Sequence, residues 1–106
     1  MKISKQDSVR QDWDDVRSWN YKLKHLDKYQ SVVYAELDGD HGEVNTTDLE
    51  RVYYIIAGQG EYINDGKTTL VSAGDVITIP PHTKFDYRPT NGATLKIVLF
   101  MELWDN

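Results

Sequence analysis

Residues 53–60 read YYIIAGQG, and residues 74–81 read GDVITIPP. Each is a short run of aromatic and β-branched residues beside glycine or proline, which is typical of a β-strand that ends in a turn. Between them, Asp65-Gly66 is the usual pair for a two-residue type I′ hairpin turn, because both positions of this turn need positive φ. This part of the chain therefore predicts short strands joined by tight turns.

The rest of the chain, followed outward from these segments, has the same character. Predicted strands cover 31–37, 51–57, 60–64, 67–71, 75–79, 84–88 and 94–103. Many short strands separated by turns predict an all-β barrel or jelly roll. The last strand is long and apolar, and an uncovered edge of that kind invites pairing with another chain. We therefore expect a homodimer built by strand exchange or sheet extension.

The N-terminal part is more polar and has a different pattern. Val9, Trp13 and Val16 recur at helical spacing after Ser8, a candidate N-cap. This spacing predicts a short helix, although the aspartates in the same stretch are weak helix formers.

A strand is predicted directly after this helix. Trp19, Tyr21 and Leu23 alternate with polar residues, so they are expected to form its buried face. We therefore divide the chain into a leader over 1–30, which packs on the barrel or on a partner subunit, and a barrel over 31–106.

Size and composition exclude several function classes. At 106 residues and 12.3 kDa the chain is one domain, and folding removes roughly two thirds of its extended-chain surface from water. The net charge of -5 argues against a nucleic-acid partner, which needs an excess of Lys and Arg. The absence of cysteine excludes a disulfide, a thiolate nucleophile and a zinc site of the Cys type. The sequence has neither a signal-peptide pattern nor a long apolar run, so we expect a cytoplasmic protein with no membrane partner.

Gly39, Asn45, Thr47, Arg51 and Gly58 follow one another at a spacing that resembles the first motif of the cupin family. In that motif a glycine leads to His-x-His, then to a glutamate and then to a closing glycine. The resemblance extends to position 89 and implies a cupin-type double-stranded β-helix, which is a jelly-roll barrel. In metal-binding cupins the two histidines and the glutamate hold a divalent ion, but here their places hold an amide, a hydroxyl and a guanidinium.

The second cupin motif supplies a third histidine to the metal. This chain has Gly74 and Pro80 at the matching spacing, then His82 in a glycine place, Phe85 in the histidine place and Pro89 in the asparagine place. An amide oxygen is a poor ligand for a transition metal, a phenyl ring cannot ligate it, and a guanidinium repels it. The resemblance therefore implies a cupin with no metal and no other cofactor.

The resemblance also implies which side chains face the barrel interior. The carried-over inward positions are Asn45, Thr47, Arg51 and Phe85. Period-two alternation adds Tyr53, Ile55, Thr83 and Tyr87. A lining that is half aromatic and half polar, with one fixed cation, is the usual composition of a small-molecule pocket. We expect ligand contacts from Arg51, Asn45, Thr47, Tyr53, Phe85 and Tyr87.

Arg51 stands where metal-binding cupins have their glutamate. A buried guanidinium needs a partner, because leaving it unpaired costs several kcal/mol. In the functional interpretation, Arg51 binds the carboxylate or phosphate of a metabolite. In the structural interpretation, it faces water or pairs with an internal carboxylate, for which the candidates are Glu36, Asp48 and Glu50.

The three histidines have different expected roles. His82 precedes the strand that carries Phe85 and is either a general acid or base oriented by Asp86 or an exposed turn residue. His41 lies in an acidic stretch that reads as a solvated turn, and His25 is structural or exposed. A metal held by His41 or His82 with nearby carboxylates stays an alternative.

Three functions are consistent with these residues. The first is metal-independent binding of a small polar metabolite, such as a sugar, an organic acid or a phosphate. The second is a metal-free isomerase or epimerase acting on a sugar or sugar nucleotide, with His82 as the base and Tyr53 or Tyr87 as the acid. The third is a structural or interaction module whose barrel is filled by its own side chains, which predicts packing of Phe85 against Tyr53 and Tyr87 with no cavity.

Overall fold

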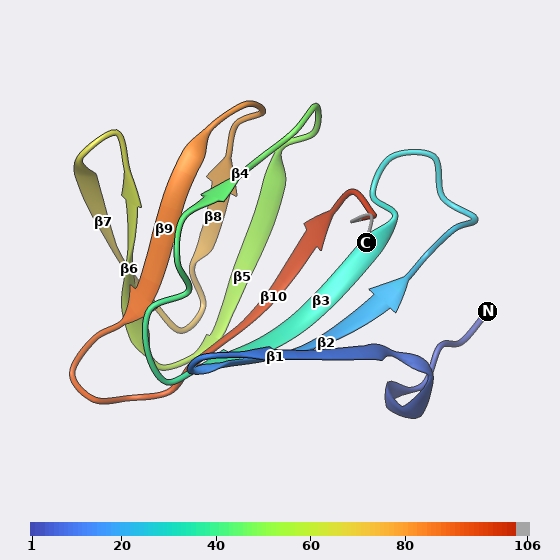
Figure 1. Ribbon diagram of the computed structural model, residues 1–106, viewed down its shortest axis with the longest axis horizontal. Coiled ribbons are helices and arrows are strands. Elements are labelled where there is room, and N and C mark those ends of the chain that lie inside the picture. The colour runs from blue at the N-terminus through green and yellow to red at the C-terminus, as the bar shows by residue number, and fades with distance from the viewer. Residues whose placement is uncertain (104–106) are drawn as a thin grey trace.

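The computed structural model describes residues 1–103, which form ten strands in two antiparallel sheets (Figure 1). The larger sheet has the spatial order β1 (Val9–Trp13), β2 (Val16–Lys22), β3 (Ser31–Leu37), β10 (Leu95–Met101), β5 (Arg51–Ala57) and β8 (Val76–Ile79). The smaller sheet has the order β4 (Val44–Asn45), β9 (Lys84–Pro89), β6 (Gln59–Asn64) and β7 (Lys67–Ser72). The helical content of residues 1–103 is one 3₁₀ turn, η1 (Lys5–Asp7), so no helix there is long enough to cross a membrane.

The predicted all-β fold is confirmed. Each strand predicted beyond residue 30 is present with small changes at its ends. The hairpin between β6 and β7 turns at Asp65 and Gly66, whose φ values of 51° and 72° are both positive. This is the backbone that the Asp-Gly pair requires in a type I′ turn.

The predicted helix near the N-terminus is wrong, because this segment is the β1–β2 hairpin. Its turn contains Asp14 with a positive φ of 47°. Val9 and Trp13 are four residues apart and so share one strand face, and Trp13 pairs directly with Val16 across the hairpin. The apolar spacing that resembles a helix therefore also fits a folded-back strand pair.

The predicted buried face of the next strand is also wrong. In β2 the buried side chains are Val16, Ser18 and Asn20, whereas Trp19 and Tyr21 lie on the opposite face. Asn20 Nδ2 donates to Val9 O at 3.0 Å and to Ser18 Oγ at 3.1 Å, so these inward polar groups are hydrogen-bonded. Since alternate residues of a strand face opposite sides, a shift of one residue reverses the whole assignment.

β10 lies in the middle of the larger sheet, between β3 and β5 (Figure 1). The expectation that residues 94–103 offer a free edge for a second chain is therefore wrong. The edges of the larger sheet are β1 and β8. A dimer formed by extending the sheet at β10 is excluded, because both of its sides are already paired.

Four buried aromatic side chains join the two sheets and are here called the aromatic cluster: Tyr53, Tyr62, Phe85 and Tyr87. Tyr62 and Tyr87 stack with ring centroids 4.8 Å apart, and Tyr53 meets Tyr62 edge to face at 5.2 Å. Tyr53 comes from β5 of the larger sheet, and the other three come from β6 and β9 of the smaller sheet. Such pairs add about 0.5–1.5 kcal/mol each beyond their area burial.

Gly58, between β5 and β6, offers a test of how closely the backbone is packed. Its φ is +87°, and an added Cβ would overlap Thr94 O and lie 3.2 Å from Leu95 Cα. Gly74 has a similar φ of +94° but nothing within 4 Å of an added Cβ. We expect Gly58→Ala to lower the free energy of unfolding by about 1–3 kcal/mol more than Gly74→Ala, the usual cost of overpacking. Urea unfolding of both variants measures this, and equal losses would contradict the close approach.

Candidate functional site

A cavity of about 160 Å³ lies between the sheets. Its apolar side chains come mainly from β3 and β10, and its polar side chains are Gln11, Ser18, Asn20, His41, Arg51 and Tyr87. The aromatic cluster packs as expected for a filled barrel, but the cavity remains beside it. The barrel is therefore only partly filled by its own side chains.

His41 is held in this cavity by the backbone around it. Its N–H donates to Tyr87 O at 3.0 Å, and the N–H of Gly42 donates to Asp86 Oδ1 at 3.0 Å. The imidazole stacks on the Tyr87 ring at 4.4 Å and meets the Trp13 ring edge to face at 5.0 Å. Trp13 Nε1 also donates to His41 O at 3.3 Å, so β1 and β9 together fix this loop residue.

The contacts of His41 determine which ring nitrogen is available. Nδ1 lies 3.2 Å from Gly42 O, and a carbonyl oxygen can only accept. In the neutral ring Nδ1 therefore carries the hydrogen and Nε2 has the free lone pair. Burial lowers the pKa of His41 below its ordinary value, and the charge of Arg51 lowers it further. His41 is thus a neutral imidazole near pH 7, which is the form that a base needs.

Arg51, at the start of β5, lines the same cavity and has no carboxylate partner among residues 1–103. Its Nη1 donates to the Tyr53 hydroxyl at 3.4 Å, and its guanidinium lies 5.9 Å from the centroid of the Phe85 ring. Both contacts are weak for a cation. The half-buried guanidinium therefore keeps most of its donors available to a ligand.

The carboxylates predicted as internal partners of Arg51 are engaged elsewhere. Glu36 pairs with Arg17 at 3.2 Å, Asp48 with His82 at 3.1 Å, and Glu50 with Lys28 at 3.3 Å. The pairing alternative for Arg51 is therefore wrong in the part of the chain that the structure describes.

Tyr53 and Tyr87 contribute hydroxyls and not phenolates. Burial raises the pKa of both groups, to a large extent for Tyr87. Their rings meet edge to face with the centroids 5.4 Å apart. Tyr87 lines the cavity, whereas Tyr53 does not. Tyr53 instead contacts two residues that line it, Arg51 by a hydrogen bond and Tyr87 by ring packing.

The other predicted site residues lie apart from this cavity. Asn45 and Thr47 are exposed, because the buried residue of this segment is Thr46, which donates to Pro80 O at 2.6 Å. Phe85 is buried in the aromatic cluster and is not part of the cavity wall. Thr47 instead bonds to Glu102 beside a second cavity of about 80 Å³, which Arg51 also lines.

His82, the predicted base, lies outside the cavity. Its side chain is 71% exposed and pairs with Asp48, which is 88% exposed. Asp86, its predicted orienting partner, binds the N–H of Gly42 instead and so supports the loop of His41. The imidazole of this site is therefore His41, although the sequence of its acidic stretch indicates a solvated turn.

Five residues that line the cavity were not predicted from the sequence as ligand-binding residues: Gln11, Trp13, Ser18, Asn20 and His41. One available signal was the alternation of Val16, Ser18 and Asn20, which places two polar side chains on the face of an apolar one. A second signal was the place of His41 just after the predicted strand 31–37, since loops at strand ends often carry function.

The residues at the metal positions of the family do not suit a metal. Arg51 brings a positive charge to the site, Phe85 is a phenyl ring in the aromatic cluster, and Asn45 and Thr47 point to solvent. Within residues 1–103, no three His, Cys, Asp or Glu side chains come together in a way that could hold a metal ion.

Comparison with known proteins agrees with this architecture. Residues 35–101 match the cupin domain family, and because this is more than half of the chain, the protein belongs to the cupin family. No curated protein matches the sequence. The predicted cupin barrel is confirmed.

Several solved structures are similar to this one. A predicted oxalate decarboxylase from Thermotoga maritima has a TM-score of 0.81 and 18% identity over 98% of this chain and 100% of that chain. Pac13, described as a unique nucleoside dehydratase, has a TM-score of 0.79 and 22% identity over 99% of this chain and 84% of that chain. Streptomyces PAC13 variants with a tyrosine or a histidine replaced have been solved with uridine. KdgF from Halomonas sp. has a TM-score of 0.74 and 20% identity over 94% of this chain and 91% of that chain.

The lowered pKa of His41 predicts a pH dependence of stability. An unfolded histidine has a pKa of about 6.5, so protonation below this pH favours the unfolded chain. The contribution of His41 is fully present above that pH and is lost as the pH falls toward its folded pKa. Urea unfolding should show a steeper loss of stability between about pH 7 and pH 5 in the native protein than in His41→Gln. Identical pH profiles would contradict a buried, neutral His41.

Proposed function

We propose that this cupin binds a small polar metabolite in the cavity without a metal, and that Arg51 binds an anionic group of that ligand. The observation that carries the proposal is the half-buried guanidinium, which lines the cavity and has no carboxylate partner among the described residues. A buried cation without a partner costs several kcal/mol, and an anionic ligand would relieve that cost.

The shape and composition of the cavity favour a ligand with one small ring or a short acid. Its volume of about 160 Å³ is below the roughly 300–1,000 Å³ of pockets that hold drug-sized molecules. Trp13, His41 and Tyr87 offer aromatic surfaces to a ring, and Gln11 offers an amide. A monosaccharide, an organic acid, or one ring of a nucleoside or nucleotide matches this space. Uridine in the related PAC13 structures supports the last of these.

Uridine and uridine 5′-monophosphate test the role of Arg51, because they differ by one phosphate. We expect the monophosphate to bind the native protein about tenfold more tightly, as one charge-assisted contact allows, and Arg51→Gln to abolish that preference. Calorimetric titration of both compounds measures it.

Arg10→Gln is the matched control, because Arg10 pairs with Asp12 on the exposed surface away from the cavity. It should keep the preference for the monophosphate. An Arg51→Gln variant that keeps the full preference would show that another group binds the anion.

We propose catalysis at the same site as a second function, because His41 is a neutral imidazole that stacks on Tyr87 in the cavity that Arg51 also lines. His41 Nε2 would take a proton from a carbon next to a carbonyl of a sugar, and the electron pair would move to the carbonyl oxygen. Arg51 would stabilise the enolate oxygen, and Tyr87 would return a proton to the opposite face of that carbon to give an epimer. The proton on His41 would then pass to the Tyr87 oxygen through solvent, which restores the neutral imidazole and the hydroxyl. Loss of water next to a carbonyl starts with the same proton removal, and Pac13 is described as a dehydratase.

The pH profile of turnover on a sugar or nucleoside substrate tests this second function. The base is active when neutral, so kcat/KM should rise with an apparent pKa below about 6.5, as the lowered pKa of His41 requires. We expect His41→Gln to lose at least about a hundredfold in kcat/KM, the usual contribution of general acid–base catalysis. His82→Ala is the control and should keep full turnover; the opposite pattern would assign the base to His82.

A further inference from the structure

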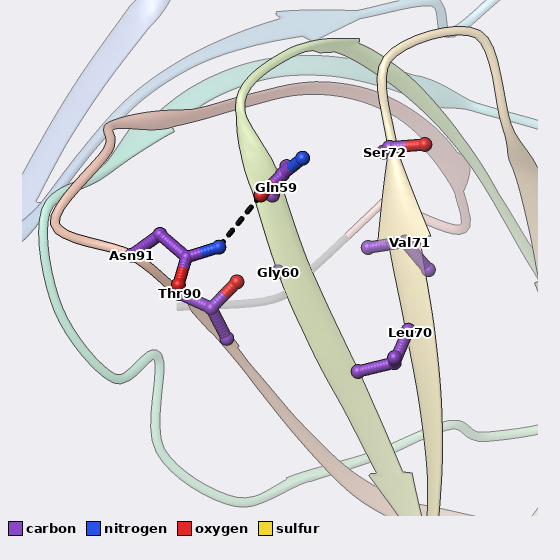
Figure 2. Close-up of a pocket in the computed structure, with 7 residues that line it drawn as sticks. All are labelled: Gln59, Gly60, Leu70, Val71, Ser72, Thr90 and Asn91. Atoms are coloured by element: carbon purple, nitrogen blue, oxygen red, sulfur yellow. Dashed lines mark hydrogen bonds between the residues drawn. The ribbon is translucent and has the colours of Figure 1, made fainter.

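A groove lies at the surface of the smaller sheet, apart from the cavity. It is formed by residues 59–60 at the start of β6, residues 70–72 on β7 and residues 90–91 after β9, and we call it the outer groove (Figure 2). Its volume is about 470 Å³, against about 160 Å³ for the cavity, and the two share no lining residue. This volume is in the range of roughly 300–1,000 Å³ that small-molecule pockets have.

The turn after β9 forms one wall of the outer groove. Asn91 and Gly92 both have positive φ, 58° and 67°, and Ala93 N–H donates to Thr90 O at 3.3 Å. This is the backbone of a type I′ turn, in which Asn-Gly is a preferred pair. Thr90 N–H donates to Gln59 O at 2.9 Å and so fixes the turn against β6. The local sequence therefore places the Asn91 side chain beside the start of β6.

The side-chain amides of Asn91 and Gln59 hold each other in a fixed orientation. Asn91 Nδ2 donates to Gln59 Oε1 at 2.7 Å, as the dashed line in Figure 2 shows. Asn91 Oδ1 is then available as an acceptor and Gln59 Nε2 as a donor, and neither has another partner among residues 1–103. The Thr90 hydroxyl lines the same groove and also has no partner in that part of the chain. The groove therefore presents donors and acceptors close together.

The described lining of the outer groove contains no charged side chain, although 27% of the chain is charged. Glu61 and Arg88, which follow on the neighbouring positions of β6 and β9, pair with each other at 2.7 Å. Their charges therefore compensate each other. A charged ligand would lose hydration here without gaining an opposite charge, which favours a neutral ligand.

Leu70 adds an apolar surface beside these polar groups. Its side chain is 76% exposed, and in Figure 2 it extends from β7 toward β6, with Thr90 on the other side of that strand. An apolar surface next to a few fixed polar groups is the usual composition of a small-molecule site.

We propose that the outer groove binds a neutral oligosaccharide. Each hydroxyl of a sugar both donates and accepts hydrogen bonds, so it matches the mixture of Gln59 Nε2, Asn91 Oδ1 and the Thr90 hydroxyl. The C–H face of a sugar ring packs on Leu70, and the volume of the groove admits more than one ring. This site is separate from the cavity and does not involve Arg51.

An NMR titration with maltotriose, cellotriose and mannotriose tests the proposal. We expect at least one of these neutral trisaccharides to shift the side-chain amide signals of Gln59 and Asn91, with a Kd of about 1 mM or tighter. Gln59→Ala should weaken this binding at least about fivefold, because it removes the donor and releases the Asn91 amide.

Two further variants and a matched control sharpen the test. Asn91→Gly removes the second amide and still accepts the positive φ of the turn, and Leu70→Ser removes the apolar surface. Both should weaken binding. Thr68→Ala is the control, because Thr68 is an exposed residue of β7 outside the groove, and this variant should bind as the native protein does.

The outcomes separate this site from the cavity. Absence of a shift at Gln59 and Asn91 with all three sugars would overturn the proposal, and so would shifts confined to the cavity residues Trp13 and His41. Arg51→Gln should leave binding in the outer groove unchanged. Failure of the ligand site at Arg51 and failure of the outer groove are therefore distinguished by the same spectra.

Discussion

The aromatic cluster is the contact on which the rest of this structure depends. Tyr53 extends from the larger sheet into the rings of Tyr62, Phe85 and Tyr87 from the smaller sheet, so the cluster joins the two halves of the barrel. Metal-binding cupins place a histidine where this chain has Phe85. Here the same region is held by ring packing, which depends on shape and on the exclusion of water. The cluster fills one part of the interior and leaves the cavity beside it.

The position of the cavity follows from this division of the interior. Tyr87 belongs both to the aromatic cluster and to the cavity wall, and its ring is the surface on which His41 stacks. The β1–β2 hairpin closes the cavity with Trp13 and two hydrogen-bonded polar side chains, Ser18 and Asn20. The N-terminal strands are therefore part of the site as well as part of the sheet. A cation, a neutral imidazole and buried hydroxyls meet there, a combination suited to a small polar ligand.

The two faces of the larger sheet serve different purposes because strand side chains alternate. Inward positions build the core and the cavity, and outward positions point away from the smaller sheet. In β5 these sets are adjacent in sequence, since Tyr53 is fully buried while Tyr54 is 46% exposed.

The sequence by itself determined the all-β fold, the cupin motifs, the strands beyond residue 30 and the Asp65-Gly66 turn. Each depends on residues close together in the chain, through period-two alternation or through the φ values that Asp and Gly accept. The place of Arg51 in the cupin motif also predicted that its side chain faces the barrel interior, where it lines the cavity. Only the tertiary structure decided the rest. The tertiary structure placed His41 in the cavity and left His82 exposed outside it. It also turned the side chains of Ser18 and Asn20 inward and placed β10 in the middle of the larger sheet. These features depend on contacts between segments far apart in sequence, such as His41 with Tyr87, and local patterns carry no record of them.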